Sequence, residues 1–220
     1  MTNPLKSYID KNVNIEITGK TFFIGKVVDV GLDIIVLNDG EKYLYIPLVH
    51  LHNINEETSE ELTISEQESP LDDTDTISYR KTLQQAKGKF VEIFVTGNKS
   101  IHGYITSVLN DYFVFYSPIY KTLFISLHHL KWLTPYNHNL TPYTLSNEEL
   151  PVNPSNIPLA RTFEEQLKKM EGKLVVFDLG DQFNKSGLLK GISNNIIELV
   201  QANGKTIHWK SYHVKTIHLP

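Results

Sequence analysis

The sequence predicts a mainly β protein built from three copies of one small unit. Residues 79–133 align on residues 163–217 at a constant offset of 84 without a gap, and ten of the 55 positions are identical. Ordinary residue usage would give about three identities. The first segment joins at an offset of 78 to 79. Within each copy the apolar period changes from helical to alternating, which predicts a helix followed by strands.

Each unit begins with a predicted short α-helix. In the third copy, Thr162 and Glu165 fit a capping box and Gly172 suits a left-handed helix stop. The second copy has a glycine at the same place. The first copy begins with Asn3 as the expected cap and Pro4 at the first helical position.

Four strands are predicted after each helix. The first strands are VNIEI, VEIFV and LVVFDL, and the second strands are GKVVDV, GYITSV and GLLKGI. The third strands are DIIVLN, YFVFYS and IIELVQ, and the fourth are KYLYI, TLFIS and TIHWK. The second strands share a glycine, at Gly25, Gly103 and Gly187. We expect the chain to bend there and neighbouring strands to approach closely.

A recurring phrase closes each unit. It reads IPLVHLHNI (46–54), ISLHHLKWL (125–133) and WKSYHVKTI (209–217), with a shared histidine at His50, His129 and His213. We interpret it as the end of strand four, a tight turn and a short fifth strand. The predicted fold is therefore three tandem five-stranded Sm-like (SH3-type) barrels, each preceded by a short α-helix. The alternative is a small barrel of another five-stranded topology.

Two interruptions divide the chain. Residues 55–75 carry nine carboxylates and no basic residue, and residues 134–160 hold five of the ten prolines. We therefore predict repeat 1 at residues 1–55, an acidic linker at 56–75, repeat 2 at 76–133, a Pro-rich linker at 134–160 and repeat 3 at 161–220. Because each unit buries modest apolar area, we expect the repeats to pack together or to share sheet edges.

Composition excludes several classes of protein. The longest apolar runs are far shorter than the roughly 20 residues of a membrane-spanning helix, and the N-terminus lacks a signal-peptide pattern. A chain without cysteine has neither disulfides nor thiolate metal sites. The net charge of −4 disfavours a general nucleic-acid binder. We expect a soluble protein that does not act at a membrane.

The sequence gives no catalytic, cofactor or metal site. Three neutral imidazoles, from His50, His129 and His213, could hold zinc if the repeats surrounded a threefold axis. The favoured interpretation is that each ring fills the turn before strand five and bonds local backbone. No nucleophile, metalloprotease, P-loop or dinucleotide motif is present. A repeated carboxylate, Asp33 and Asp111, becomes Asn195 in the third copy, which suits a turn residue. We expect no enzyme and no small-molecule substrate.

RNA binding is the alternative that the predicted fold invites. Sm-like RNA binders use asparagine, an Arg-Gly pair and stacking aromatic side chains in their loops. The only two arginines here, Arg80 and Arg161, lie in or beside predicted helices. Aromatic residues that alternate in strands are more often packing residues. Nucleic-acid binding is therefore disfavoured, and a cytoplasmic Sm-like RNA-binding or regulatory protein is kept as the alternative.

The triplicate closing phrase resembles the N-terminal region of the spore coat protein CotB family. HHLKWL (128–133) and YHVKTI (212–217) carry the resemblance, whereas VHLHNI (49–54) has diverged because His52 replaces the lysine. The resemblance covers nearly the whole chain. Two features depart from the family: the double-glycine turn between strands one and two is missing, and no Ser-, Lys- and Arg-rich tail follows Pro220.

The resemblance implies a structural component of the outer spore coat. Such a protein is made in the mother cell, assembles on the forespore with other coat proteins and itself, and is not catalytic. The missing tail puts in doubt any role that depends on phosphorylation of such a tail. Linked modules raise one another's effective concentration, which suits an assembly protein.

Overall fold

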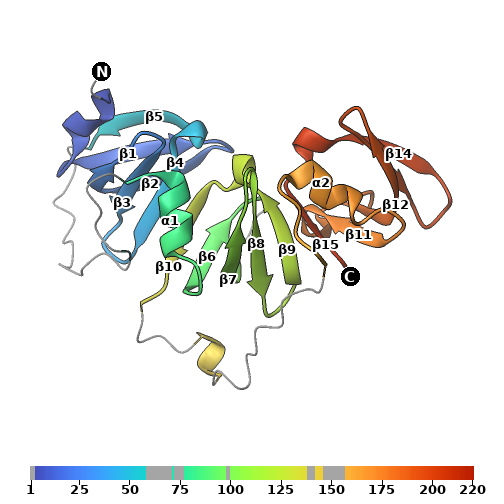
Figure 1. Ribbon diagram of the computed structural model, residues 1–220. Helices are drawn as coiled ribbons and strands as arrows, with labels where there is room; N and C mark the ends of the chain where they lie inside the picture. The colour runs from blue at the N-terminus through green and yellow to red at the C-terminus, as the bar shows by residue number, and fades with distance from the viewer. Residues whose placement is uncertain (1–2, 58–70, 72–76, 98–99, 138–141, 146–156) are drawn as a thin grey trace. The chain divides into compact units, whose positions relative to one another are not determined.

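The computed structural model describes residues 3–57, 71, 77–97, 100–137, 142–145 and 157–220. It contains two compact units, formed by residues 1–94 with 131–140 and by residues 95–130 with 141–220 (Figure 1). The described chain is mainly β and its strands pair antiparallel, which confirms the predicted class. Most of the predicted acidic linker and much of the Pro-rich linker lie outside the described residues. No described helix combines the length and apolar character needed to cross a membrane.

The first unit is an antiparallel sheet with short helices at its margins. Its strand order is β5-β1-β2-β3-β4-β10-β6. The elements are η1 (Pro4–Tyr8), β1 (Asn12–Ile17), β2 (Thr21–Val30), β3 (Ile34–Asn38), β4 (Tyr43–Pro47), η2 (Leu48–His50), β5 (Leu51–Glu56), α1 (Tyr79–Gln85), β6 (Phe90–Phe94) and β10 (Trp132–Pro135). The inward faces of β1 to β4 form a core that includes Ile15, Leu37 and Ile46, with Trp132 packed against it.

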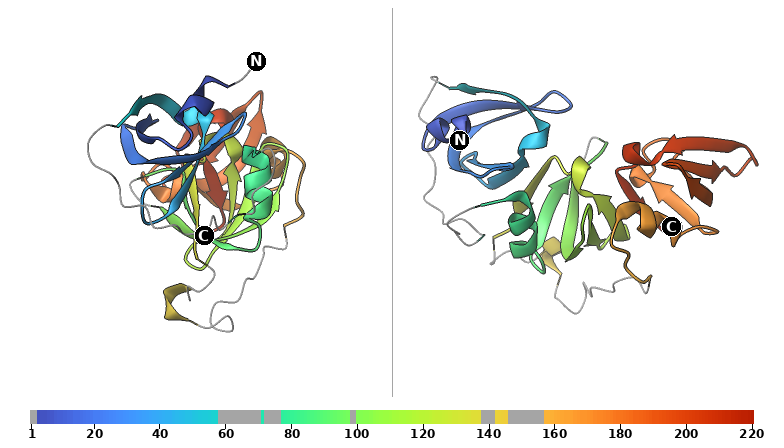
Figure 2. Two further views of the ribbon diagram at one scale, coloured as in Figure 1. Left: turned by 90° about the vertical axis from the view of Figure 1, so that its left-hand side faces the viewer. Right: turned by 45° about the horizontal axis from the view of Figure 1, so that its top comes forward.

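The second unit has the strand order β7-β8-β9-β15-β11-β12-β13-β14. Figures 1 and 2 show β11 to β14 curling strongly instead of lying flat. The elements are β7 (Ile101–Val108), β8 (Tyr112–Ser117), β9 (Lys121–Ser126), η3 (Leu127–His129), η4 (Pro142–Thr144), α2 (Phe163–Lys168), β11 (Leu174–Phe177), η5 (Asp178–Gly180), β12 (Ser186–Ser193), β13 (Ile196–Val200), β14 (Thr206–Lys210), η6 (Ser211–His213) and β15 (Thr216–His218). Its core joins β8 and β9 to α2 and to the strands of repeat 3.

The shared glycine lies in the second strand of every repeat, as predicted. A Cβ atom on Gly25, Gly103 or Gly187 would collide with a carbonyl oxygen of the facing third strand, that of Asn38, Tyr116 or Val200 respectively. In each repeat the pairing of the second and third strands also shifts register a few residues later. Such bulges bend and twist a strand, so the repeats share one curvature device.

The helices agree with the predictions in two repeats of three. Thr162 and Glu165 form the predicted capping box, and Gly172 has a left-handed φ of 78°. In the first repeat the expected α-helix is wrong. Pro4–Tyr8 is a five-residue 3-10 helix, although Asn3 Oδ1 does accept a hydrogen bond from the N–H of Leu5. Its backbone hydrogen bonds join residues three apart, from the N–H of Lys6 to the Asn3 carbonyl and from the N–H of Ile9 to the Lys6 carbonyl, which is the 3-10 pattern.

The first strand of repeat 3 ends earlier than predicted. The expected strand LVVFDL stops at Phe177, because Asp178 and Leu179 have positive φ values of 50° and 61° and start η5. The Asp178 carboxylate is only 1% exposed and bonds Lys185 Nζ at 2.6 Å. The buried carboxylate thus redirects the chain where the other repeats continue into a turn.

Neighbouring repeats share one type of strand pairing. In the first unit β4 pairs with β10, the fifth strand of repeat 2, and in the second unit β9 pairs with β15, the fifth strand of repeat 3. Within the described residues, β4 does not pair with β5, and β15 does not pair with β14. The sheets are therefore open at these positions, and the hydrogen-bonded pairing does not confirm three separate barrels. The residues predicted as repeat 2 contribute to both units.

Candidate functional site: the joint between neighbouring repeats

The pairing of a fourth strand with the fifth strand of the following repeat is named here the repeat joint. The first joint pairs β4 with β10 through Leu133 and Tyr45. The second pairs β9 with β15, with Ile217 opposite Phe124. By the alignment of the repeats, Leu133 corresponds to Ile217 and Tyr45 to Phe124. The two joints therefore have the same register.

Both joints exclude water from their strands. Tyr45, Phe124, Leu133 and Ile217 are all at most 2% exposed. Fully burying a side chain of this kind contributes about 1.5 to 3 kcal/mol. In the first joint, Lys42 Nζ lies 3.1 Å from Glu92 Oε2 and 5.1 Å from the centre of the Trp132 ring. The joints thus combine backbone pairing with core-like packing.

A repeated aspartate ties each repeat to the helix of the next. Asp33 Oδ1 accepts a hydrogen bond from the N–H of Tyr79 at 2.8 Å, and Asp111 Oδ1 accepts one from the N–H of Phe163 at 2.8 Å. Tyr79 and Phe163 are the first residues of α1 and α2. A carboxylate at a helix start satisfies an orphan N–H and complements the helix dipole. Asn195 holds the same place in repeat 3, the last repeat of the chain.

A second carboxylate fixes the strand that completes the second joint. Asp178 Oδ1 accepts hydrogen bonds from the N–H groups of Lys215 and Thr216, at 2.7 and 3.1 Å. Its Oδ2 receives Lys185 Nζ at 2.6 Å, and that ammonium lies 4.1 Å from the centre of the Trp209 ring. The Lys215 carbonyl in turn accepts the N–H of Ser126 at 3.0 Å. Asp178 therefore holds the start of β15 in place against β9.

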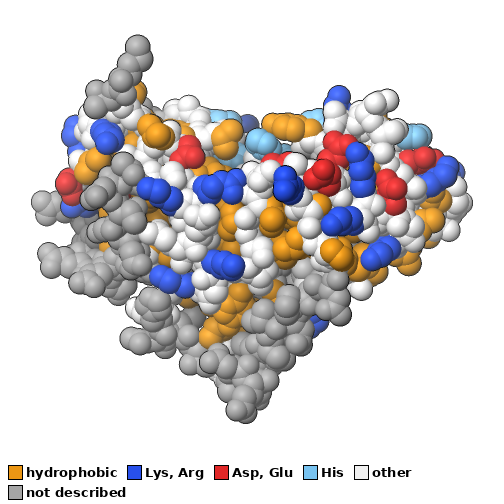
Figure 3. Space-filling model, in the orientation of Figure 1, with side chains coloured by type: hydrophobic (Ala, Val, Ile, Leu, Met, Phe, Trp, Pro, Cys, Tyr) orange, Lys and Arg blue, Asp and Glu red, His pale blue; other side chains and the backbone are white. Residues whose placement is uncertain are grey.

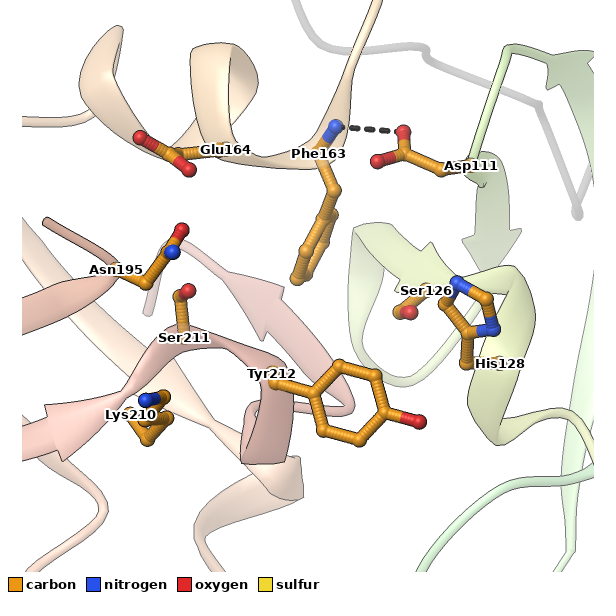
Figure 4. Close-up of a pocket in the computed structure, with 9 residues that line it drawn as sticks. All are labelled: Asp111, Ser126, His128, Phe163, Glu164, Asn195, Lys210, Ser211 and Tyr212. Carbon is orange, nitrogen blue, oxygen red and sulfur yellow. Dashed lines mark hydrogen bonds between the residues drawn. The ribbon is translucent and has the colours of Figure 1, made fainter.

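A pocket of about 390 Å³ lies beside the second joint. Figure 4 shows that repeat 2 supplies one side of it and repeat 3 the other. It is lined by Asp111, Ser126, His128, Phe163, Glu164, Asn195, Lys210, Ser211 and Tyr212. Three of the lining side chains are charged: Asp111, Glu164 and Lys210. Asp111 accepts the N–H of Phe163, and Glu164 forms an ion pair with Lys168 at 2.8 Å. The pocket is thus a consequence of how the repeats join.

The three shared histidines occupy equivalent positions, as the last residues of η2, η3 and η6. Their surroundings differ. His50 is buried and its carbonyl accepts the N–H of Thr18 at 2.8 Å. His129 Nε2 lies 2.8 Å from the Tyr212 carbonyl oxygen, so its partner belongs to the next repeat and not to the local turn. His213 is exposed and its ring packs 5.8 Å from the Tyr212 ring.

Burial and one hydrogen bond determine the protonation of His129. Burial lowers the pKa of His129, and the hydrogen bond to the Tyr212 carbonyl only partly opposes that effect. A neutral imidazole donates this bond from Nε2. Over the described part of the chain, no three His, Asp or Glu side chains gather in a way that could hold a metal ion. The shared histidines are therefore not brought together as zinc ligands there.

Positively and negatively charged side chains of the second unit are interspersed on the face seen in Figure 3. At the right of that view, Lys and Arg side chains lie between Asp and Glu side chains. Arg80 lies in α1 and Arg161 directly precedes α2, where its carbonyl accepts the N–H of Asn110 at 3.3 Å. A phosphate-binding surface would gather such cations along one groove. This face lacks that pattern.

Sequence reasoning missed the role of the repeated aspartate. Asp33 and Asp111 do lie in the turn before a third strand, as predicted, but their carboxylates reach the following repeat. A signal was present: the carboxylate occurs in the two repeats that a further helix follows and is lost in the third. Asp178 gave no such signal, because the aligned residue is an exposed or half-exposed strand position in the other repeats, Glu16 in repeat 1 and Phe94 in repeat 2.

Comparisons with known proteins found two family models and two proteins of Bacillus subtilis (strain 168) that are similar to this chain. One family model, described as YwrJ third domain, matches residues 162–217, and another, described as Domain of unknown function (DUF6897), matches residues 3–49. The Uncharacterized protein YwrJ of Bacillus subtilis (strain 168) is 53% identical over 222 residues, covering 98% of this chain and 99% of that protein. Spore coat protein B of the same organism is 24% identical over 217 residues, which are 99% of this chain and 54% of that protein. The chain thus spans about half the length of that coat protein.

Proposed function

The chain belongs to the YwrJ family, and from that premise we propose that it is a non-catalytic structural component of the bacterial spore coat. The observation that carries the proposal is the repeat joint, used twice with one register. A protein that already links its own repeats through sheet edges and helix caps has the geometry of an assembly module. The similarity to spore coat protein B supplies the setting.

The proposed role includes a location in the spore and a class of partner. We propose that the protein is made in the mother cell, assembles in the outer coat and contacts other coat proteins. Three linked repeats offer several attachment points on one chain, and linked sites strengthen attachment through effective concentration. Each repeat is proposed to be an Sm-like variant of the SH3-type fold, supported by the strand order fifth-first-second-third-fourth in repeats 1 and 3.

A fluorescent fusion expressed from its own promoter in a sporulating Bacillus host tests this function. The expected result is a ring of fluorescence around the developing spore, appearing after engulfment begins. Fluorescence that stays diffuse in the mother cell, while a known coat protein in the same cells forms its ring, would refute the coat assignment. A fusion with Asp178→Ala serves as a matched destabilised control.

The second candidate, an Sm-like RNA-binding or regulatory protein of the cytoplasm, makes a different prediction. Purified chain would retain RNA, and the logarithm of the affinity would fall linearly with the logarithm of salt concentration. The scattered cations on the face shown in Figure 3 favour the coat proposal instead. Absence of RNA retention at low ionic strength would eliminate this candidate.

A further inference from the structure

The two outermost strands of the chain lack the partners that their counterparts have. In the described residues, no strand pairs with the outer edge of β5 or of β14. β14 is a fourth strand, like β4 and β9, and β5 is a fifth strand, like β10 and β15. A repeat joint consists of one fourth strand and one fifth strand. β14 and β5 are therefore the two kinds of strand that form a joint, and they lie at opposite ends of the strand order.

Burial follows the same division. All four residues of β10 and all three of β15 are buried, whereas none of β5 is. Four consecutive residues of β4 and four of β9 are buried, whereas β14 alternates between exposed and half-buried side chains. Neither end strand has a proline, and each has one charged side chain, Glu56 or Lys210. Natural sheets usually protect free edges with charges, prolines or bulges. β5 has one register irregularity, at His52 between Leu51 and Asn53, so the part of β5 from Asn53 to Glu56 and the whole of β14 are weakly protected.

The existing joints define how the end strands would pair. Carrying the register of Ile217 with Phe124 through the repeat alignment places Ile54 opposite His208. The same operation places Asn55 opposite Ile207. No two like charges then oppose each other at neutral pH.

The backbone donors of both strands point the right way. The N–H of Ser211 bonds Asn195, the residue before β13, and the N–H of Glu57 bonds Asn12 in β1. Successive N–H groups of a strand alternate in direction. His208 and Ile54 each lie three residues earlier, so their N–H groups point to the outer edges.

We propose that the chain self-associates head to tail, with β14 of one molecule pairing antiparallel with β5 of a second copy in the register Ile54 to His208. Such a contact is heterologous, because it uses a different surface on each molecule, and it produces rings or filaments. The inference deepens the proposed coat function and rests on it for its biological setting.

Cysteine cross-linking tests the register directly, because the natural chain has no cysteine. Ser126 and Lys215 form a hydrogen-bonded pair, and pair types alternate, so the pair of Asn55 with Ile207 is of the non-hydrogen-bonded type. Its Cα atoms would be about 4.5 Å apart, which a disulfide can span. Chains with Asn55→Cys are mixed with chains carrying Ile207→Cys and oxidised.

The expected result is a covalent dimer that contains one chain of each kind, formed much faster than in either chain alone. Trp209→Cys in place of Ile207→Cys is the matched control, since that position is diagonal to Asn55 at about 7 to 8 Å. Equal cross-linking of both pairs, or none of the first, would overturn the proposed register.

Sedimentation of the full chain tests the association itself. Wild-type protein should exceed the mass of one 25.2 kDa chain increasingly as its concentration rises. His208→Pro removes one outward N–H and should weaken association about tenfold or more, whereas His208→Ala retains the N–H and should not. A single-chain mass at every concentration would overturn the inference. It would leave the coat assignment standing if the fluorescent fusion still rings the spore.

Discussion

Replacing Asp178 with alanine tests how the second joint is held. The carboxylate is 1% exposed and receives three hydrogen bonds, from Lys185 Nζ and from the N–H groups of Lys215 and Thr216. Alanine would leave a buried ammonium and two backbone donors unsatisfied. Breaking a buried ion pair by removing one partner costs about 3 to 5 kcal/mol, so we expect a loss of stability in that range. The free energy of unfolding of the second unit should fall accordingly.

The chain's own fluorescence suits the measurement. Of the two tryptophans, Trp209 lies in the second unit beside Lys185, and Trp132 lies in the first. In a Trp132→Phe background, urea unfolding followed by fluorescence reports on the surroundings of Asp178. A shift of the unfolding free energy below about 0.5 kcal/mol, the size of an ordinary surface substitution, would refute the reasoning.

A double variant separates the cost of the unpaired Lys185 ammonium from the cost of the two unsatisfied N–H groups. Adding Lys185→Met to Asp178→Ala removes the buried charge but leaves the two N–H groups without their acceptor. We expect part of the lost stability to return, because replacing both members of a buried pair with apolar residues is often neutral or stabilising. If stability does not return at all, the ammonium was not the main source of the loss.

Three further predictions concern the same unit. Burial lowers the pKa of His218, so the folded state favours its neutral form; the resulting stability is complete above about pH 6.5 and is lost as the pH falls through the lowered pKa. In His218→Gln the denaturation midpoint should depend less on pH below about pH 6.5. A pH profile identical to that of the wild type would contradict this. Asp111→Ala should destabilise the unit by about 0.5 to 2 kcal/mol by removing the acceptor for Phe163 N–H, and Asp111→Asn should lose less because it keeps an acceptor oxygen. Equal losses would contradict this, since they would mean that the negative charge and not the acceptor oxygen supplies the stabilisation. Gly103→Ala should push the second and third strands apart at Tyr116 and lower the melting temperature, and a neutral result in calorimetry would show that the strands can yield.

Local patterns predicted much of the fold. The capping box at Thr162, the left-handed glycine at Gly172 and the close approach at Gly103 are all as the sequence indicated. Each depends on residues near one another in the chain or on one steric requirement. The first helix was predicted in the wrong form, because a cap residue such as Asn3 and a proline at the first position favour a helix start without distinguishing a 3-10 helix from an α-helix.

The joints could not be predicted in the same way. Any strand edge offers the same N–H and C=O groups, so the residues of β9 do not indicate whether β9 will pair with β15 or with β10. Shared edges were expected in general terms, but not the register. The sequence likewise did not show that Asp178, which aligns with Phe94 of repeat 2 and Glu16 of repeat 1, would be buried and would hold the start of β15. Long-range pairing is determined by burial over the whole unit and not by a local pattern.

The order of the joints along the chain has a consequence for synthesis. β4 ends at Pro47 and its partner β10 begins at Trp132, about 85 residues later. At about 5 to 20 residues per second, the ribosome takes roughly 4 to 17 seconds to supply that partner. During this time Tyr45, which is 2% exposed in the finished protein and pairs with Leu133, lies on an edge that β10 does not yet cover. A newly made repeat that awaits its partner strand can therefore pair with other strand edges for a short time. The length of chain between the two strands of the joint determines how long this lasts.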